Sequence, residues 1–474
     1  MAQNKFYDRT EELRTLTEKY RELEESEKSV MLAIYGRRRV GKTELVRTWM
    51  ENKPRKLYLY VDLAEKKVLL TSFSSAVQEQ LKENVIFPDF ESFFKYITEK
   101  SEEHSFILII DEFQRFLSVA PEVITSLQKH WDISLKNKKI MILLVGSSIG
   151  MIQKITSSKA GALYGRASKI KISSFRYQDF RLMFKDFNEE EKIQRYAVFG
   201  GTPYYIEKTK RFNDTITAIQ ELLLKKGGEL SEEPKTLLEY ENVRIHSKYN
   251  SILQSISSGK DILKEIQDFT KIPSTTIPAY LDKLDYLLDL VEKNDPLLGK
   301  ERLRRYRIKD NFFKFWYKFI FKNQTALNLN NINFVLEIIK TDLNSYVGKI
   351  FEDIIKELLI SYNGKEINNH LINFENIGSW WDRNNNEVDI LTNNSKNKAI
   401  LVGEIKWSSK PVDVDVVDNL LRKSKFINAG GKYDFLIVSK AGFTAVCETK
   451  MKENNFLYLD LKGVAELFNK ISQE

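Results

Sequence analysis

The sequence predicts an α/β protein in which two α/β regions are separated by a helical region. Short apolar runs alternate with helical stretches over residues 1–176, only helical spacing follows as far as residue 322, and the alternation returns after residue 346. Alternating strands and helices are typical of a parallel sheet covered by helices. A chain of 474 residues is also too long for one hydrophobic core, so we expect several domains.

The strands of the first region are predicted from five apolar runs, at residues 30–34, 57–61, 106–110, 140–145 and, more briefly, 169–172. The run at 106–110 is almost wholly apolar, as expected in the middle of a parallel sheet. Helices are predicted at residues 8–27, 42–50 and 68–82. This region is therefore predicted to be a doubly wound parallel sheet.

A glycine-rich loop lies between the first predicted strand and the helix at 42–50, and it fits the pattern G-x-x-x-x-G-K-[ST] with Gly36, Arg37, Arg38, Arg39, Val40, Gly41, Lys42 and Thr43. Such a loop turns its backbone N–H groups around phosphates, and the following helix N-terminus adds partial positive charge. Lys42 would reach the β- and γ-phosphates, and the Thr43 hydroxyl would hold Mg²⁺. A chance glycine turn is the alternative, but the flanking strand and helix argue against it.

Two acids and two serines follow neighbouring strands of the same predicted sheet. Asp111 and Glu112 end the strand at 106–110, at the edge where a parallel sheet places its ligands. Asp111 is predicted to bind Mg²⁺ through water and Glu112 to act as the general base, unless both are merely solvated. Ser147 and Ser148 would sense the γ-phosphate. Arg166 is either an arginine finger, in cis or toward a neighbouring subunit, or a solvated loop residue.

The middle of the chain is predicted to contain a winged helix-turn-helix at residues 242–309, followed by a buried aromatic helix at 312–321. The expected recognition helix, 275–288, contains Asp282 and Asp285 and only one base, Lys283, so it is poorly suited to read base edges. Basic residues gather instead on the expected wing, at Lys300, Arg302, Arg304, Arg305, Arg307 and Lys309. Contact with a phosphate backbone and an ordinary solvated or lid-contacting strand face remain equal alternatives.

The C-terminal region combines an acid on a helix with charged residues on two strands. Glu352 lies on the helix predicted at 346–360, and strands are predicted at 388–391, 399–405 and 435–438. Strand alternation puts Glu404 and Lys406 on one face, where Asp389 of the neighbouring strand can meet them. Asp389 and Glu404 would hold Mg²⁺, and Lys406 would position a water for attack on phosphorus. Chance Glu-x-Lys triplets are common in a chain with 30% charged residues.

Composition limits the remaining possibilities. The chain is 42% hydrophobic, has no apolar run long enough to span a membrane, and begins without a signal-peptide pattern. Its single cysteine, Cys447, predicts a reducing, cytoplasmic setting without intrachain disulfides. Four widely spaced histidines make a zinc site improbable. The net charge of +8 permits nucleic-acid contact without demonstrating it.

Motifs along most of the chain together resemble the archaeal-type ATPases related to the AAA+ and STAND groups. They are residues 6–9, 35–43, 111–112, 146–148, 163–166 and 200–203. The resemblance implies a core ATPase, a helical lid, a winged-helix domain and, in one branch, a nuclease-like C-terminal domain of unknown function. It implies ATP rather than GTP as the ligand, because no guanine-specifying Asn-Lys-x-Asp segment is present.

The C-terminal residues are similar to the PD-(D/E)XK nuclease pattern. That similarity implies that Asp389 and Glu404 are metal ligands, Lys406 the catalytic lysine and Glu352 the helix acid. The chain departs from the pattern at its first motif, where 387–389 reads Glu-Val-Asp in place of Pro-Asp. The expected domains are an ATPase core at 1–176, a lid at 177–241, a winged helix-turn-helix with the aromatic helix at 242–322, a linker or helix at 323–345 and a nuclease-like domain at 346–474.

The expected function is Mg²⁺-dependent ATP hydrolysis coupled to a DNA-binding, DNA-cleaving C-terminal domain. The alternative is a nucleotide-dependent switch or scaffold whose C-terminal domain binds or assembles without cleaving. ATP and Mg²⁺ are the expected cofactors and DNA the expected partner, with homo-oligomers possible and no membrane association. The sequence does not assign roles to Arg37, Arg38 and Arg39.

Overall fold

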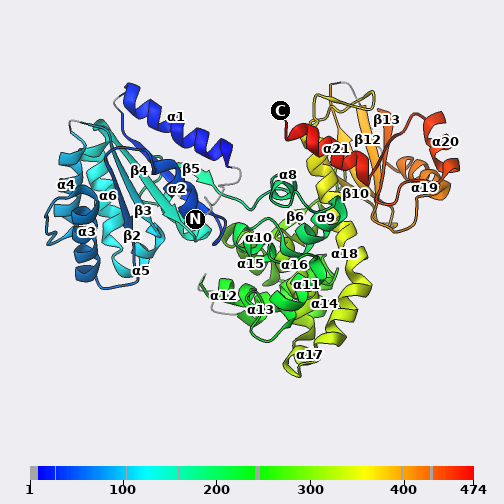
Figure 1. Cartoon of the computed structure of the whole chain (residues 1–474), viewed down its shortest axis with the longest axis horizontal. Helices are drawn as coiled ribbons and strands as arrows, with labels where there is room; N and C mark the ends of the chain where they lie inside the picture. The colour runs from blue at the N-terminus through cyan, green and yellow to red at the C-terminus, as the bar shows by residue number, and fades with distance from the viewer. Residues whose placement is uncertain are drawn as a thin grey trace. The chain divides into compact units, whose positions relative to one another are not determined.

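The computed structural model describes residues 9–26, 28–102, 104–157, 161–240, 246–396, 399–427 and 431–473. The chain divides into two compact units, one up to Ser174 with the short segment Asp282–Asp289, the other containing Phe175–Leu281 and Leu290–Glu474 (Figure 1). The first division lies close to the boundary predicted at residue 176. The predicted motif residues 6–8 and the predicted start of the winged helix-turn-helix at residue 242 lie outside the described residues.

The first unit is built on a five-stranded parallel sheet, as predicted. Its strands are β1 (Val30–Tyr35), β2 (Lys56–Tyr60), β3 (Phe106–Asp111), β4 (Ile140–Gly146) and β5 (Ser168–Lys171), in the order β2-β3-β4-β1-β5. Every neighbouring pair is parallel, with Tyr60 opposite Asp111 and Tyr35 opposite Gly146. Because β4 lies between β1 and β3, the segments that follow these three strands meet at one edge of the sheet.

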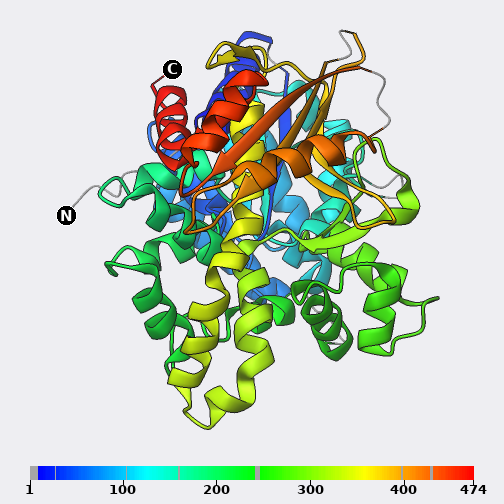
Figure 2. The same cartoon turned by 90° about the vertical axis from the view of Figure 1, so that its right-hand side faces the viewer.

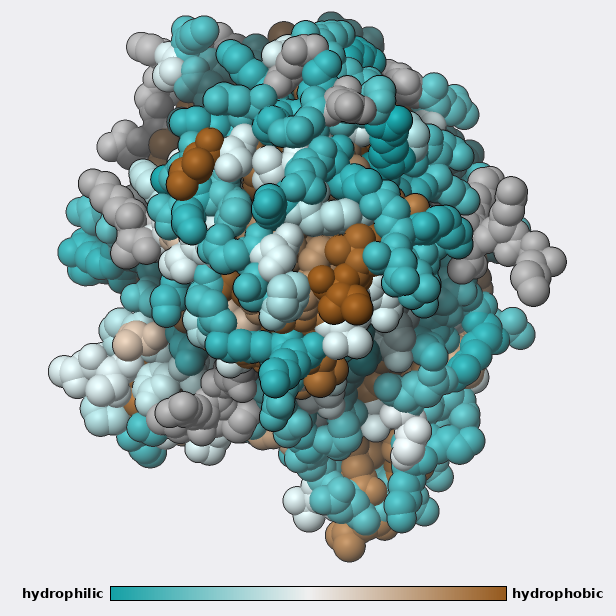
Figure 3. All heavy atoms as spheres, turned by 90° about the vertical axis from the view of Figure 1, so that its left-hand side faces the viewer, coloured by the Kyte–Doolittle hydropathy of each residue, from teal (hydrophilic) through white to brown (hydrophobic). Residues whose placement is uncertain are grey.

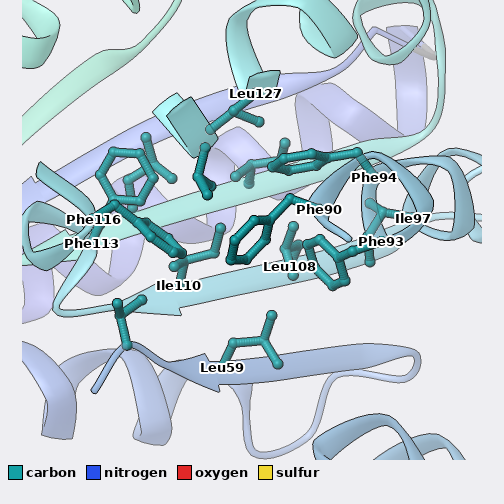
Figure 4. Close-up of a cluster of buried hydrophobic side chains, with 14 of the residues drawn as sticks. Leu59, Phe90, Phe93, Phe94, Ile97, Leu108, Ile110, Phe113, Phe116 and Leu127 are labelled. Atoms are coloured by element: carbon teal, nitrogen blue, oxygen red, sulfur yellow. The ribbon is translucent and has the colours of Figure 1, made fainter. Parts of the chain in front are cut away.

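Both faces of this sheet are buried, which explains why its strands are apolar throughout. Phe106, Leu108 and Ile110 point into one hydrophobic cluster, and Ile107 and Ile109 into the other. The first cluster is closed by α3 (Lys66–Leu81), α4 (Phe90–Lys100), α5 (Phe116–Val119), α6 (Glu122–Ile133) and α7 (Ile149–Thr156). The second is closed by α1 (Thr10–Ser26) and α2 (Lys42–Met50). Figure 4 shows the aromatic side chains of the first cluster packed on β3.

One face of the molecule is shown in Figure 3 as mainly hydrophilic, with a small hydrophobic group near its centre. Large apolar side chains that are exposed in the first unit include Leu63, Val68 and Ile86. Among the described residues, no helix has both the length and the apolar character that a membrane span requires.

The second unit begins with short helices, as the helix-only pattern predicted. They are α8 (Tyr177–Phe180), α9 (Glu189–Phe199), α10 (Pro203–Thr209), α11 (Thr215–Ile219) and α12 (Glu233–Tyr240), followed by α13 (His246–Ser257), α14 (Leu263–Thr270) and α15 (Ile277–Asp282). An antiparallel hairpin of β6 (Val291–Asn294) and β7 (Arg305–Ile308) follows. The helix expected to start at residue 275 begins at Ile277, and the π-helical turn that continues it, Lys283–Leu287, lies in the segment assigned to the first unit.

The predicted aromatic helix is α16 (Asn311–Phe315), continued by a π-helical turn, Trp316–Ile320. All its aromatic side chains from Phe312 to Phe319 are buried, whereas Phe321 is only half-buried. Trp316 donates its indole N–H to the Ser231 carbonyl at 2.7 Å. Core packing therefore explains the aromatic run.

The region at 323–345, predicted as linker or helix, contains α17 (Gln324–Asn328) and the start of one long helix, α18 (Ile332–Ser361). The helix starts well before residue 346 because Val335, Leu336, Ile339 and Leu343 already bury an apolar stripe. In Figure 2, α18 runs in yellow from the helical part to the second sheet.

The second sheet contains β10 (Asn376–Trp381), β11 (Glu387–Asn393), β12 (Ala399–Lys406), β13 (Lys432–Ser439) and β14 (Leu457–Asp460), in that order. Its first three strands are antiparallel and its last three parallel. Helices α19 (Val414–Ser424), α20 (Ala445–Glu453) and α21 (Leu461–Ile471) and the small pair β8 (Glu366–Ile367) and β9 (His370–Leu371) complete this part. The predicted second α/β region is thus present as a mixed sheet.

Candidate functional site

The glycine loop of the first unit connects β1 to α2, as predicted. Gly41 adopts a left-handed conformation, with φ of 93°, immediately before the helix begins at Lys42. Gly36 packs against the Ile172 carbonyl so closely that a Cβ atom would overlap it. Lys42 is only 5% exposed, and its ammonium donates to the carbonyls of Gly36 at 2.9 Å and Arg37 at 2.8 Å. The loop therefore holds the lysine against its own backbone.

Thr43 and Asp111 meet at the edge of the sheet. The Thr43 hydroxyl donates to Asp111 Oδ2 at 2.9 Å, and the Tyr58 hydroxyl donates to the same oxygen at 2.6 Å. Asp111 is 2% exposed, and its Oδ1 accepts the Glu112 N–H at 2.8 Å. Burial, then the bond to Asp111, raises the pKa of Tyr58, which stays protonated as a donor. The sequence predicted only that Tyr58 lies in a strand, and its contact with Asp111 was not foreseen.

Glu112 and Ser147 also meet, as expected for residues at the ends of β3 and β4. Ser147 Oγ donates to Glu112 Oε1 at 2.8 Å, and Gln114 Nε2 donates to Glu112 Oε2 at 2.7 Å. Arg115 lies 3.4 Å from the same carboxylate. Glu112 has a φ of 56°, an unusual value for a residue other than glycine. Ser148 lies next to this network and precedes α7.

The contacts that Arg166 forms lie away from the glycine loop. Its guanidinium forms a bidentate pair with Asp132, at 2.8 and 2.7 Å, and also donates to the carbonyls of Ala162 and Tyr164. The arginine pairs with a part-exposed acid near the surface, and both the solvated and the arginine-finger interpretations stay open. A different arginine touches the loop, since buried Arg9 donates to the Val40 carbonyl at 2.9 Å and to the Ser173 carbonyl at 2.6 Å.

In the second unit, the structure brings together the residues of the predicted C-terminal constellation. Ile390 pairs with Gly403, which sets the residues next to them, Asp389 and Glu404, at one level of the sheet. Asp389 Oδ2 accepts the Ile405 N–H at 2.8 Å, and Lys406 Nζ lies 2.6 Å from Glu404 Oε1. The predicted shared face of Glu404 and Lys406 is confirmed by this contact.

Glu352 of α18 adds a third acid to this group. Burial, then the negative charge of Asp389, raises the pKa of Glu352 to about 7. Burial, then the charge of Glu404, raises the pKa of Asp389. Asp389 thus lies close enough to be affected by one acid and to affect another. Lys349 pairs with Glu352 at 3.0 Å.

Lys423 of α19, also missed from the sequence, donates to both oxygens of Glu404, at 3.2 and 3.1 Å. It is only 13% exposed. Glu404 thus carries two lysine partners, because Lys406 holds the same carboxylate. Helical spacing around Lys423 could have placed it on a helix, but no sequence pattern pairs that helix residue with Glu404 of β12.

The basic hairpin strand faces acids of its own unit. Arg305 pairs with Glu387 at 3.1 Å and covers the Trp381 ring at 4.5 Å. Arg307 pairs with Asp353 of α18 at 2.8 Å and with Glu292 of β6. Of the two alternatives left open for this strand, these contacts favour packing within the protein over contact with phosphate.

The residues at both sites supply oxygen ligands, which suit Mg²⁺. At the first site, Thr43 and the buried Asp111 are already within 2.9 Å of each other. At the second, Asp389 raises the pKa of Glu352 and Glu404 raises that of Asp389, and a bound cation would relieve this repulsion. No group of three or more His, Cys, Asp or Glu residues within the described ranges is arranged to hold a metal ion. Water or substrate oxygens would therefore have to complete either coordination shell.

Comparison with known proteins identifies the family. A family model described as an ATPase domain predominantly from Archaea matches residues 6–209, and one described as Archaea bacterial proteins of unknown function matches residues 316–418. The uncharacterized protein MJECL04 of Methanocaldococcus jannaschii is 33% identical over 431 residues, which are 89% of this chain and 92% of that relative. The chain belongs to this archaeal-type ATPase family. The predicted ATPase family is thus confirmed, whereas the nuclease resemblance stays a prediction.

One solved structure supports the fold, and a second is similar at a lower score. The Walker-type ATPase PABY2304 of Pyrococcus abyssi has a TM-score of 0.51 at 21% identity, over 66% of this archaeal-type ATPase and 95% of that chain. The ORC2 protein of Aeropyrum pernix, solved as ADPNP–ADP complexes, has a TM-score of 0.44 at 14% identity, over 71% and 96% of the two chains. The first of these supports a P-loop ATPase fold for this chain.

Proposed function

We propose that the first unit binds and hydrolyses ATP with Mg²⁺ and that this reaction controls a DNA-cleaving centre in the second unit. One observation carries the first half. Thr43 and Asp111 lie in direct hydrogen-bond contact beside the buried Lys42, at the edge of the sheet where the glycine loop opens. A metal-ligating hydroxyl, a buried carboxylate and a phosphate-binding lysine are the parts that nucleotide hydrolysis requires.

Each residue of the loop has a defined task in ATP binding. Lys42 exchanges the carbonyls of Gly36 and Arg37 for β- and γ-phosphate oxygens, because a charged phosphate is a stronger acceptor than a peptide carbonyl. The backbone N–H groups from Gly36 to Thr43 and the start of α2 surround the phosphates. Thr43 and Asp111 would hold Mg²⁺, which supplies positive charge that stabilises the transferred phosphoryl group.

Glu112 orients and deprotonates the attacking water. Ser147 and Gln114 hold its carboxylate at the end of β3, so little positioning entropy is lost when it acts. Ser147 and Ser148, which follow β4, sense the γ-phosphate by contacting it. Because Ser147 holds Glu112, a γ-phosphate that attracts the serine hydroxyl also releases the base.

Arg166 acts as an arginine finger, toward its own site or that of a neighbouring copy of the chain. In that role it exchanges Asp132 for the γ-phosphate. Replacing Arg166 with Ala in a mixture with Lys42→Ala chains separates the two possibilities. Restored ATP hydrolysis in the mixture would assign the finger to the neighbouring copy, and its absence would leave only the role in cis or none.

The second unit cleaves phosphodiester bonds in DNA. Asp389 and Glu404 would hold Mg²⁺, which polarises the phosphate, and Glu352 completes the acidic group. Lys406 positions the attacking water, and its contact with Glu404 keeps its ammonium at the shared face. The convergence of these residues from a helix and two strands supports this part of the proposal. The hairpin of β6 and β7, with the helices before it, is a winged helix-turn-helix that links this centre to the ATPase cycle.

A second candidate function is binding or assembly without cleavage. It is favoured by Lys423, which with Lys406 neutralises Glu404 twice. A carboxylate held by two ammonium groups is a weaker metal ligand than a free one. In this alternative, ATP hydrolysis switches a C-terminal surface that holds DNA intact.

The experiment that separates these functions is incubation of the full chain with ATP, Mg²⁺ and single-stranded, duplex and branched DNA. Cleavage that disappears in Asp389→Ala and Lys406→Ala, while ATP hydrolysis continues, supports a nuclease. Intact ATP hydrolysis with no cleavage of any DNA form would leave only the binding function. Loss of ATP hydrolysis in Lys42→Ala tests the part that both functions share.

A further inference from the structure

A cavity of about 270 Å³ lies inside the second unit, between the hairpin strand β7, α16 with its π-helical turn, and α18. Glu352 lines it, so the cavity adjoins the carboxylate group described above. Its volume is just below the range of about 300–1,000 Å³ that is typical of small-molecule sites. It has room for one nucleotide but is too small for a duplex.

Charge in the cavity is unbalanced. Six basic side chains and four carboxylates line it. Four of the basic groups have acidic partners, since Arg305 pairs with Glu387, Arg307 and Lys356 with Asp353, and Lys349 with Glu352. The remaining charged residues of the lining are Lys314, Lys318 and Asp261, so the basic groups still outnumber the acids.

Lys314 and Lys318 lie one helical turn apart against aromatic rings. The charges of Asp353 and Glu352 act on Lys314, and that of Asp342 acts on Lys318. Lys314 Nζ is 5.9 Å from the centre of the Tyr346 ring, and Lys318 Nζ is 5.8 Å from the same ring and 5.4 Å from that of Phe319. Within the part of the chain that the structure describes, neither ammonium forms an ion pair or a side-chain hydrogen bond. Burial lowers the pKa of both, so a bound anion would stabilise their charged forms.

We infer that this cavity binds a phosphate group of a nucleotide, free or at the end of a nucleic-acid strand, through Lys314 and Lys318. The inference rests on the proposed function for its choice of anion, because Glu352 lines both the cavity and the candidate phosphodiester centre. Partly buried cations that form no ion pair or side-chain hydrogen bond are suited to charge-assisted hydrogen bonds with phosphate oxygens. A nucleic-acid strand whose terminal phosphate binds in this cavity would lie next to Glu352.

The test is a binding measurement on the full chain in EDTA, so that no cleavage occurs. The parent is Lys42→Ala, which removes phosphate binding by the glycine loop. The probes are a short single-stranded DNA labelled at its 3′ end, with a 5′-phosphate or a 5′-hydroxyl, and AMP and inorganic phosphate as competitors. Fluorescence anisotropy gives each dissociation constant.

We expect Lys314→Gln combined with Lys318→Gln to weaken binding of the 5′-phosphorylated strand by about tenfold or more. Lys322→Gln, one turn further along and outside the cavity lining, is the matched control and should change the affinity by less than about twofold. Lys314→Arg keeps the charge and should retain affinity. Lys318→Gln alone, together with thermal unfolding of every variant, separates lost binding from lost folding.

The probes also distinguish the sources of the phosphate. AMP competing as strongly as the oligonucleotide assigns the cavity to a free nucleotide, and preference for the 5′-phosphorylated strand assigns it to a strand end. Equal affinity of parent and double variant for every probe would overturn the inference, as would equal competition by phosphate-free polyglutamate. If the site binds but no DNA is ever cleaved, the proposed nuclease fails while this site stands.

Discussion

Asp353 on α18 connects the hairpin strand β7 to the C-terminal part of its unit through Arg307, and Asp353→Asn tests that contact. Arg307 Nη1 lies 2.8 Å from Asp353 Oδ1, and Lys356 reaches the same oxygen at 3.5 Å. The asparagine keeps the shape of the side chain and removes only its charge. Any effect of the change therefore measures the ion pairs.

The magnitude follows from the pKa of Asp353. Burial alone would raise it, but Arg307, Lys356 and Lys314 together lower it from 3.8 to about 2. A difference of that size corresponds to about 2.5 kcal/mol for a fully shielded group. Because 37% of the side chain is exposed, solvent screening reduces the expected contribution to about 1 kcal/mol.

The sign with pH follows from the same values. The folded pKa is below the unfolded one, so the contribution is complete above about pH 4 and disappears as the pH falls toward about 2. Wild type and Asp353→Asn should therefore differ at neutral pH and converge in acid.

Hydrogen exchange of α18 and β7 peptides is the suitable assay, because a chain of two units does not unfold in one step. At neutral pH, Asp353→Asn should lower the local opening free energy of both peptides by about 1 kcal/mol. Glu337→Gln is the matched control, since its pair with Lys340 is exposed on the same helix. Equal exchange in wild type and Asp353→Asn at neutral pH would refute the reasoning, as would a difference that persists near pH 2.

Further predictions concern the two sites. Gly36→Ala should destabilise the first unit by about 1–3 kcal/mol, seen as a lower melting temperature, because its Cβ would overlap the Ile172 carbonyl; an unchanged melting temperature would contradict this packing. Tyr58→Phe should weaken Mg²⁺-dependent ATP hydrolysis about tenfold, because Asp111 loses one of its hydrogen bonds, and unchanged Mg²⁺ dependence would remove Tyr58 from the site. Lys423→Gln should raise the Mg²⁺ affinity of the second site in calorimetry, since it frees a carboxylate, whereas lower affinity would mean that the lysine supports the ligands.

Sequence patterns predicted the first unit closely because each signal there is local. The helix at Lys42–Met50 has the predicted bounds, and all five strands lie within a residue or two of their apolar runs. A buried parallel strand is apolar on both faces, which makes it visible without knowledge of its neighbours. The glycine loop and Asp111 could be placed for the same reason, since both directly follow such strands.

The sequence was less informative where long-range contacts decide the structure. The helix of the C-terminal region was predicted to begin at residue 346, but the apolar stripe of Val335, Leu336 and Ile339 extends it back to Ile332. The roles of Tyr58, Lys423 and Arg305 depend on partners far away along the chain, and no spacing rule reports such partners. Arg305 in particular was expected either to meet phosphate or to be solvated or contact the lid, and its carboxylate partner, Glu387, lies 82 residues away.

The most direct test of the proposed coupling is DNA cleavage by the full chain with ATP and Mg²⁺, compared among wild type, Lys42→Ala and Lys406→Ala. We predict cleavage by wild type, a loss of about 100-fold or more in Lys42→Ala through the absent ATP hydrolysis, and none in Lys406→Ala with ATP hydrolysis retained. Cleavage that is equal in wild type and Lys42→Ala would contradict the coupling. Cleavage that survives in Lys406→Ala would contradict the assigned centre.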